Sequence, residues 1–230
     1  MYEQNKSPMS YAARLSCWAA VVGGAISTSA ILVFSVYVPG HALDGPKAQS
    51  ALFIVINIAG ATGMTLIVYG LPGLYARWHE SWGGLGLAGI ALIALAEMIF
   101  GFVSLMAATL YSWLGSVAPD LFKDPHPAPL ISVVFLIWLI AIMAGNVLMA
   151  IAILRRRFAR RWVGFVQIGS AVMSLVYLAA ALTPPSVPVS LVGSLGPILL
   201  CVAVGYLGYI GASETRAVRA EAVPRRAQRA

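Results

Sequence analysis

The chain has 230 residues, of which 60% are hydrophobic and only 10% carry a charge. Soluble globular domains carry about 25% charged residues, so this composition excludes an ordinary soluble domain and indicates a membrane protein. The net charge of +7 comes mainly from arginines in one short segment and near the C-terminus. We expect these arginines to be attracted to anionic lipid headgroups, and we expect no binding to nucleic acid.

Six apolar runs of the sequence are each long enough to cross a hydrocarbon core of about 30 Å as a helix. They predict an all-α fold, a six-transmembrane-helix bundle at residues 15–212, between a cytoplasmic N-terminal segment at 1–14 and a basic cytoplasmic tail at 213–230. The predicted spans are about 15–38, 51–71, 85–114, 130–154, 162–182 and 189–212. We expect Pro72 to end or kink the second span, because proline removes a backbone N–H and its ring disrupts the helix.

Five arginines lie between the fourth and fifth spans, namely Arg155, Arg156, Arg157, Arg160 and Arg161. Short loops rich in Lys and Arg stay on the cytoplasmic side during insertion. This segment therefore predicts a cytoplasmic turn that contacts lipid headgroups, with both termini on the same side. We expect a multi-pass protein of the inner, or plasma, membrane.

Two segments around the second and third spans carry a resemblance to a known group of proteins. They are Gly70-Leu71-Pro72-Gly73-Leu74-Tyr75-Ala76-Arg77 and Trp82-Gly83-Gly84-Leu85-Gly86-Leu87. This pattern resembles that of small uncharacterised multi-spanning bacterial membrane proteins. The resemblance implies a bacterial inner-membrane location and carries no residue roles.

Glu97 is the one charged side chain within the six predicted spans. A carboxylate at the bilayer centre costs at least about 2.5 kcal/mol, so such a residue usually faces inward, is paired or is protonated. We expect Glu97 to hold a proton much of the time near neutral pH. It then suits a proton carrier, and equally a neutral acid that ties helices together by hydrogen bonds. Its expected partners are neutral polar residues on other spans, namely Thr62, Thr65, Tyr177, Asn57 and Asn146.

The predicted outer loops contain a second set of candidate residues, His41, Asp44, Asp120, Asp124 and His126. Imidazole and carboxylate groups are ligands that zinc accepts. Two loops could together supply four ligands, although the Asp-Pro-His-Pro sequence is also typical of a rigid, solvated loop. A metal site is therefore one interpretation of these loops.

Small residues form two possible helix-packing faces. The first consists of Gly23, Gly24, Ala25, Ser27 and Ser29, and the second consists of Gly205, Gly208 and Gly211. Small side chains let helices approach closely in lipid. These faces predict packing within the bundle, against a second copy of the chain, or against another membrane protein.

The sequence has no phosphate-binding loop, no Gly-x-Ser-x-Gly elbow and no His-Glu-x-x-His motif, and it indicates no cofactor. Our first hypothesis is a protein that binds or assembles within the membrane, without catalysis. The alternative is a small proton- or cation-coupled transporter that uses Glu97. A membrane enzyme with a metal in the outer loops is the third hypothesis.

Overall fold

All regular elements of the described residues are helical in the computed structural model, which confirms the predicted all-α class. The structure describes residues 9–38, 43–118, 120, 129–157, 159–181 and 189–227. In chain order the elements are α1 (Tyr11–Tyr37), α2 (Gly45–Gln49), α3 (Ala51–Met106), a π-helical turn η2 (Ala107–Tyr111), α4 (Ser112–Val117), α5 (Pro129–Arg156), α6 (Arg161–Ala181) and α7 (Val189–Ala227).

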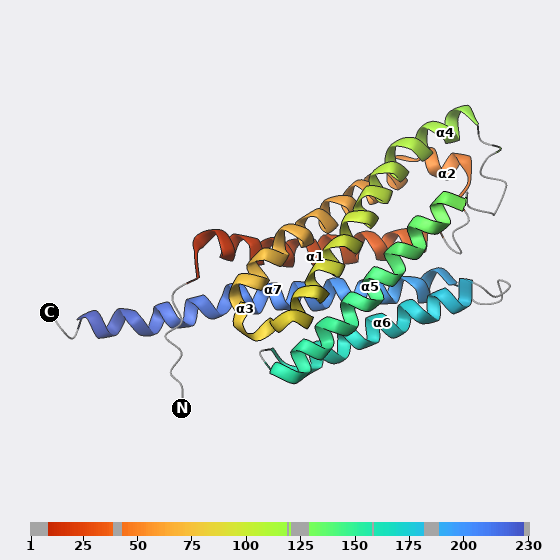
Figure 1. The fold of residues 1–230 in the computed structure, drawn as a ribbon. Helices are drawn as coiled ribbons and strands as arrows, with labels where there is room; N and C mark the ends of the chain where they lie inside the picture. The colour runs from red at the N-terminus through yellow and green to blue at the C-terminus, as the bar shows by residue number, and fades with distance from the viewer. Residues whose placement is uncertain are drawn as a thin grey trace.

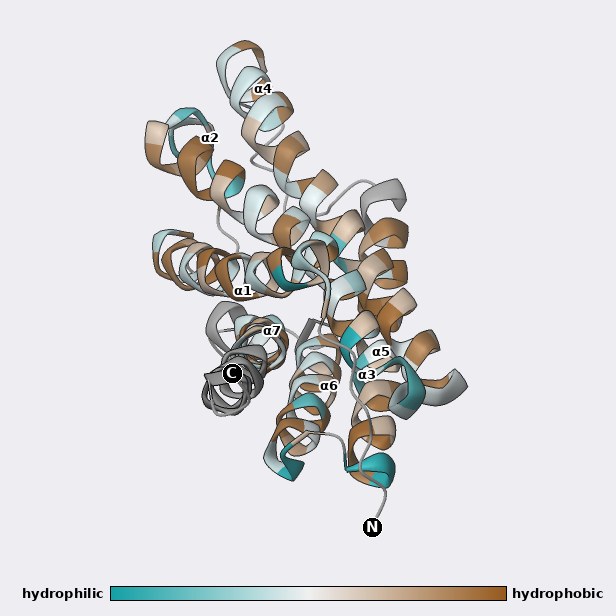
Figure 2. Cartoon of the chain, turned by 90° about the vertical axis from the view of Figure 1, so that its left-hand side faces the viewer, coloured by the Kyte–Doolittle hydropathy of each residue, from teal (hydrophilic) through white to brown (hydrophobic). Residues whose placement is uncertain are grey.

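Five helices in the described part of the chain are long and apolar enough to cross a membrane: α1, α3 with its continuation to Val117, α5, α6 and α7. Their outward faces are also apolar. Val36, Phe102 and Phe165 are 75%, 63% and 61% exposed, and Figure 2 shows hydrophobic residues along the long helices. Large apolar side chains on both buried and exposed faces are typical of helices surrounded by lipid. The chain is built as a membrane-embedded protein.

Three helices begin at polar capping residues. The side chain of Ser10 accepts a hydrogen bond from the Ala13 N–H at 3.2 Å, at the start of α1. Asp44 caps α2 in the same way, and Ser50 accepts from the Phe53 N–H at 3.1 Å to begin α3. Such caps satisfy backbone N–H groups that have no partner within the helix, so these starts follow from local sequence.

Helix α3 turns back on itself near its middle. The backbone leaves helical geometry at Trp78 and at Gly83, where φ is +59°, a conformation that glycine adopts at little cost. We call residues 51–77 leg 1 and residues 84–106 leg 2. The two legs pack together: a Cβ added at Gly101 in leg 2 would lie 3.6 Å from the Cβ of Met64 in leg 1. The break that we expected at Pro72 therefore falls at residues 78–83.

A side chain from α1 explains why Pro72 does not end the helix. The Ser16 hydroxyl donates a hydrogen bond to the Tyr69 carbonyl and accepts one from the Gly73 N–H at 2.8 Å. It thereby satisfies backbone groups next to the proline. Neighbouring Ser and Thr side chains commonly allow proline to remain inside a membrane helix in this way.

The six long segments form a closed ring. Going round it, the order is α1, leg 1, leg 2, α5, α6 and α7, and α7 packs back against α1. Figure 1 shows α2 and α4 at one end of the bundle, which we call the α4 end. The turn of α3 and the turn between α5 and α6 lie at the opposite end. We call this the arginine end.

The small residues of α1 do not form a single face. Gly23 and Gly24 are buried, and so is Ser27, whereas Ala25 and Ser29 are exposed on the other side of the helix. A Cβ at Gly23 would lie 2.6 Å from the carbonyl oxygen of Gly63. One at Gly24 would lie 2.6 Å from the carbonyl oxygen of Cys201. These glycines are thus occupied by leg 1 and α7, rather than left for a partner.

The second small-residue row is also used within the chain. A Cβ at Gly208 would lie 2.6 Å from the carbonyl oxygen of Cys17, and one at Gly211 would lie 2.9 Å from the Cys17 sulfur. Gly205 faces Gly24 across the same α1–α7 contact. The packing role that the sequence predicts for these glycines is therefore intramolecular.

The C-terminal segment, which the sequence predicts to be a basic tail, is helical as far as it is described. Helix α7 continues to Ala227, well past residue 212, where we expected the sixth span to end. Residues 213–223 are rich in Ala, Arg and Glu and contain neither Gly nor Pro. These residue types have high helix propensity, so the helix can continue after the apolar run ends.

We predict that Gly23→Ala lowers the free energy of unfolding by about 1–3 kcal/mol, because the added methyl meets backbone atoms that cannot move aside. Denaturant unfolding in mixed micelles measures this effect. Gly84→Ala is the matched control, since nothing lies within 4 Å of a Cβ at that position, and we expect it to cause no loss. If both variants have the same free energy of unfolding, α1 and leg 1 can move apart to make room for the methyl group without loss of stability.

Candidate functional site

A cavity of about 270 Å³ lies inside the ring, in the half nearer the α4 end. Its lining extends from Phe100 in leg 2 to Tyr111 in η2, which corresponds to about 16 Å at 1.5 Å per residue. Every segment of the ring contributes to it: Ala30 and Phe34 from α1, Phe53 and Met64 from leg 1, Phe100 from leg 2, Phe135 and Trp138 from α5, Tyr177 from α6, and Gly193 and Pro197 from α7. The cavity exists only because all six segments meet.

One side of the cavity is aromatic. Trp138 is stacked on Phe100 with ring centroids 4.9 Å apart, and Phe135 lies 4.9 Å from Trp138. Phe135 also makes an edge-to-face contact with Tyr177 at 5.6 Å. We call these four residues the aromatic wall. Since paired rings restrict one another's rotation, the wall is a preformed surface.

A few polar groups interrupt the apolar lining. Asn57 donates a hydrogen bond to the Phe53 carbonyl of its own helix at 2.9 Å, and Ser104 lies across from Gly60. Ser194 is hydrogen-bonded to Ser35 of α1. A mostly apolar cavity with a small number of polar groups is the usual composition of a small-molecule site.

Glu97 lies one helical turn beyond the cavity, on the side of the arginine end. It is 4% exposed, and its Oε2 atom is buried without a hydrogen-bond partner. The Cys201 thiol of α7 is within electrostatic range of Glu97 and beside the Ser27 hydroxyl of α1. Ser27 and Cys201 are likewise one turn past the cavity residues Ala30 and Pro197. We call Ser27, Glu97 and Cys201 the carboxyl cluster.

A second buried polar group joins α5, α6 and α7. Asn146 donates hydrogen bonds to the Ile142 carbonyl at 2.8 Å and to Ser170 Oγ at 3.1 Å. Ser170 in turn donates to the Gly196 carbonyl at 2.7 Å. Asn146 Oδ1 and both amide atoms of Gln167 are buried without partners. A buried polar atom that stays without a partner costs about 1–3 kcal/mol.

The partners that we expected for Glu97 lie elsewhere. Thr62 and Thr65 are exposed on the outside of leg 1 and donate to the Ile58 and Ala61 carbonyls of their own helix. Asn146 bonds α6, while Asn57 and Tyr177 line the cavity. The sequence reasoning was wrong for the two threonines, because polar spacing alone does not give the rotation of a helix.

Sequence reasoning also missed the other two members of the carboxyl cluster. Ser27 was considered only as a small packing residue, and Cys201 was not considered as a site residue. Nothing in their local sequence indicates a carboxyl neighbour, because the three residues come from α1, leg 2 and α7. Their proximity is a result of ring closure.

The arginine side chains of the described segments lie far from Glu97. Arg14 is 13 residues along α1 from Ser27, or about 20 Å at 1.5 Å per residue. In leg 1, Gly101 faces Met64 and Gly60 faces Ser104, so Glu97 is level with about Ile67, and Arg77 is 10 residues, or about 15 Å, farther along. The arginines at positions 155, 156, 157, 160 and 161 are all exposed at the arginine end. Within the described part of the ring, no arginine is therefore adjacent to Glu97 to balance its carboxylate form.

The turn between α5 and α6 has a distinctive backbone. Arg157 follows the last residue of α5 with φ of 52°, and its N–H donates to the Ile153 carbonyl at 2.9 Å. This left-handed conformation ends a helix and is usually supplied by glycine. Because this residue is an arginine, the position that ends α5 also carries a positive charge. The turn lies beside the α3 turn, since a Cβ at Gly83 would be 3.8 Å from the Arg156 guanidinium.

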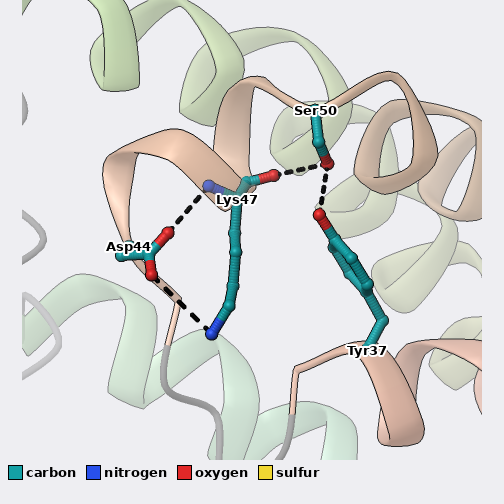
Figure 3. A network of polar contacts seen from close by, with 4 residues as sticks. All are labelled: Tyr37, Asp44, Lys47 and Ser50. Atoms are coloured by element: carbon teal, nitrogen blue, oxygen red, sulfur yellow. Dashed lines mark hydrogen bonds and ion pairs between the residues drawn. The ribbon is translucent and has the colours of Figure 1, made fainter.

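The structure assigns Asp44 a local role at the α4 end. Its carboxylate accepts from the Lys47 N–H at 2.7 Å and pairs with Lys47 Nζ at 3.7 Å (Figure 3). Beside them, the Tyr37 hydroxyl donates to Ser50 Oγ at 2.7 Å, and Ser50 donates to the Lys47 carbonyl. This network fixes the entry into α3.

Only two of the five predicted metal ligands, Asp44 and Asp120, are among the residues that the structure describes. Asp120 is exposed, while His41, Asp124 and His126 lie outside the described residues. Among the residues that are described, no three His, Cys, Asp or Glu side chains come together as metal ligands. Asp44 is already engaged with Lys47, so the loop metal site stays a prediction.

We predict that Glu97 carries its proton at pH 7 in the ligand-free protein, because its carboxyl group is buried without a neighbouring cation. Difference infrared spectroscopy of the reconstituted protein should then show a protonated carboxyl band that Glu97→Gln removes. Glu80→Gln is the control, since the Glu80 side chain is 72% exposed, and it should leave the band unchanged. A spectrum without this band at pH 7 would contradict the prediction.

Comparison with protein-family models, with curated proteins and with solved structures gives no match for this chain. The function is therefore inferred from the arrangement of the cavity, the aromatic wall and the two polar clusters.

Proposed function

We propose that this chain is a six-crossing membrane protein that binds a small, mostly apolar molecule in the cavity inside its helix ring. The observation that carries the proposal is the cavity itself, to which all six segments contribute lining residues. Apolar, aromatic-lined cavities with a few polar groups are the usual sites for small ligands. This proposal develops our first hypothesis, binding within the membrane.

The six crossings count leg 1 and leg 2 of α3 as separate spans. Leg 1 and leg 2 run in opposite directions and pack against each other, which supports this count. The exposed arginines at the arginine end support a cytoplasmic location for that end and for both termini. We further propose a bacterial inner membrane, as the sequence resemblance implies, with the cavity in the outer half of the bilayer.

Proton-coupled transport is the second candidate function. It is favoured by the position of Glu97, one turn from the cavity with an unpartnered carboxyl oxygen. Ionisable groups inside a membrane bundle frequently serve proton relays and transport paths. Binding in the cavity is the first step that both candidates require, so it is the step to test first.

We predict that leg 1 and leg 2 both cross the membrane. In a protein with Cys17 and Cys201 replaced by alanine, new cysteines are placed at Glu80 in the α3 turn and at Ser116 in α4, both exposed. A membrane-impermeant maleimide should label Ser116→Cys in intact cells and Glu80→Cys only after permeabilisation. Labelling of both sites in intact cells would rule out the proposed crossings.

We predict that Gly60→Leu abolishes ligand binding by filling the cavity. A Cβ at Gly60 has only ordinary contacts, 3.8 Å from Ser104 Oγ and 3.9 Å from the Ala30 Cβ, so the larger side chain can enter the cavity. Equilibrium dialysis of neopentylbenzene against protein in nanodiscs, with empty nanodiscs subtracted, measures the binding.

Gly84→Leu is the matched control for this experiment. It adds the same side chain at a position with no atom within 4 Å, away from the cavity. We expect at least a tenfold loss of affinity for Gly60→Leu and none for Gly84→Leu. Equal binding by both variants would place the ligand outside the cavity. If the unsubstituted protein binds neither neopentylbenzene nor its cationic counterpart benzyltrimethylammonium, the proposed function is refuted.

A further inference from the structure

Among the described residues, a carboxyl group lies close to the cavity but no arginine or lysine does. Glu97 lies one turn past the cavity residue Phe100, at an axial distance of about 4.5 Å. Arg14 and Arg77 lie toward the arginine end, and Lys47 is held by Asp44 in α2 at the opposite end. When Glu97 gives up its proton, no described arginine or lysine is adjacent to balance the carboxylate. A positively charged group at the end of the cavity would do so.

The aromatic wall adds a second attraction for a cation. Phe100 belongs to this wall and lies one turn from Glu97, which is itself outside the cavity lining. Phe100 and its stacked partner Trp138 are therefore the part of the wall nearest to the carboxyl group. Aromatic faces attract ammonium groups through the ring quadrupole, most strongly when water is excluded. The remainder of the lining is apolar and suits a hydrocarbon body.

The size of the cavity limits the ligand. Its volume of about 270 Å³ is close to the lower end of the range of about 300–1,000 Å³ for small-molecule sites. Its extent along leg 2 exceeds what a compact ion needs. These dimensions suit a short aromatic or aliphatic body with one charged end.

We propose that the ligand of this cavity is a small lipophilic monocation, a protonated amine or a quaternary ammonium compound, whose charged end pairs with Glu97. This inference rests on the proposed function, because it names the class of ligand that the cavity binds. Binding is an exchange. The Glu97 carboxylic acid releases its proton to solvent as the cation enters, so the site is neutral before and after.

The titratable groups that face Glu97 are few. Cys201 of α7 is within electrostatic range, and α5 has no ionisable residue between Phe135 and Leu154. Tyr69 of leg 1 and Tyr209 of α7 are exposed, and Tyr206 packs on Trp162 of α6. The remaining ionisable groups lie farther along their helices, namely Cys17 of α1, Arg77 of leg 1, Tyr111 beyond leg 2 and Tyr177 of α6. Because Cys201 is the nearest alternative source of a released proton, Cys201→Ala is required as a control.

The experiment compares two ligands of the same shape. Benzyltrimethylammonium carries a fixed positive charge, and neopentylbenzene is its neutral counterpart with carbon in place of nitrogen. Equilibrium dialysis against protein in nanodiscs of neutral lipid, with empty nanodiscs subtracted, gives both affinities. We expect Glu97→Gln to lower the affinity for the ammonium compound at least tenfold and to leave the affinity for neopentylbenzene unchanged.

Proton release provides an independent measurement. In weakly buffered solution, binding of benzyltrimethylammonium should release one proton per cation bound, and its affinity should fall about tenfold for each unit that the pH drops below neutral. Cys201→Ala should keep this behaviour. Glu97→Asp, which retains the carboxyl group, should keep the proton release even if Glu97→Gln fails to fold.

The outcomes separate this inference from the proposed function. If neopentylbenzene binds and the ammonium compound does not, or if Glu97→Gln weakens neither ligand, the cation inference is wrong and the cavity remains a binding site for neutral molecules. If neither ligand binds, both proposals fail. Proton release that persists in Glu97→Gln and disappears in Cys201→Ala would also overturn the role of Glu97.

Discussion

Close approach of backbones at glycine residues is the constraint on which this structure depends. Helices in lipid gain little from burying apolar surface against one another, so their association relies on tight packing and on hydrogen bonds between helices. A Cβ at Gly89 of leg 2 would lie 2.9 Å from the backbone nitrogen of Met149 in α5, and one at Gly23 of α1 would lie 2.6 Å from the carbonyl oxygen of Gly63 in leg 1. Such contacts close the ring at several interfaces.

Ring closure explains why polar groups come to lie in the interior. Once six segments surround one axis, their inward residues meet there whatever their separation in sequence. Asn146, Ser170 and the Gly196 carbonyl connect α5, α6 and α7 by hydrogen bonds, whereas Glu97 is left with an unpartnered oxygen. The hydrogen bonds of Asn146 and Ser170 hold helices together. The unpartnered Glu97 oxygen is not used in this way.

Glu97 could be identified as a candidate from the sequence, whereas the cavity could not. Glu97 was identified from the sequence as a candidate, because a charged residue within an apolar run is expensive and therefore conspicuous. The cavity was not predicted, since Phe100, Phe135 and Trp138 resemble ordinary residues of membrane helices. Likewise, Ser16 supports the backbone beside Pro72 from a distant part of the chain, so the turn of α3 falls later than the position of the proline indicates.

The sequence by itself determined the all-helical class and the presence of apolar runs long enough to cross a membrane, because both follow from local composition and length. It also identified the arginine segment and Glu97, whose charges are unusual in their surroundings. Only the tertiary structure decided that Thr62 and Thr65 face outward, and that Cys201 lies beside Ser27 and within electrostatic range of Glu97. The reason is physical: helix rotation and ring order depend on packing between distant segments, and apolar runs without a polar face do not specify which side of each helix is turned inward.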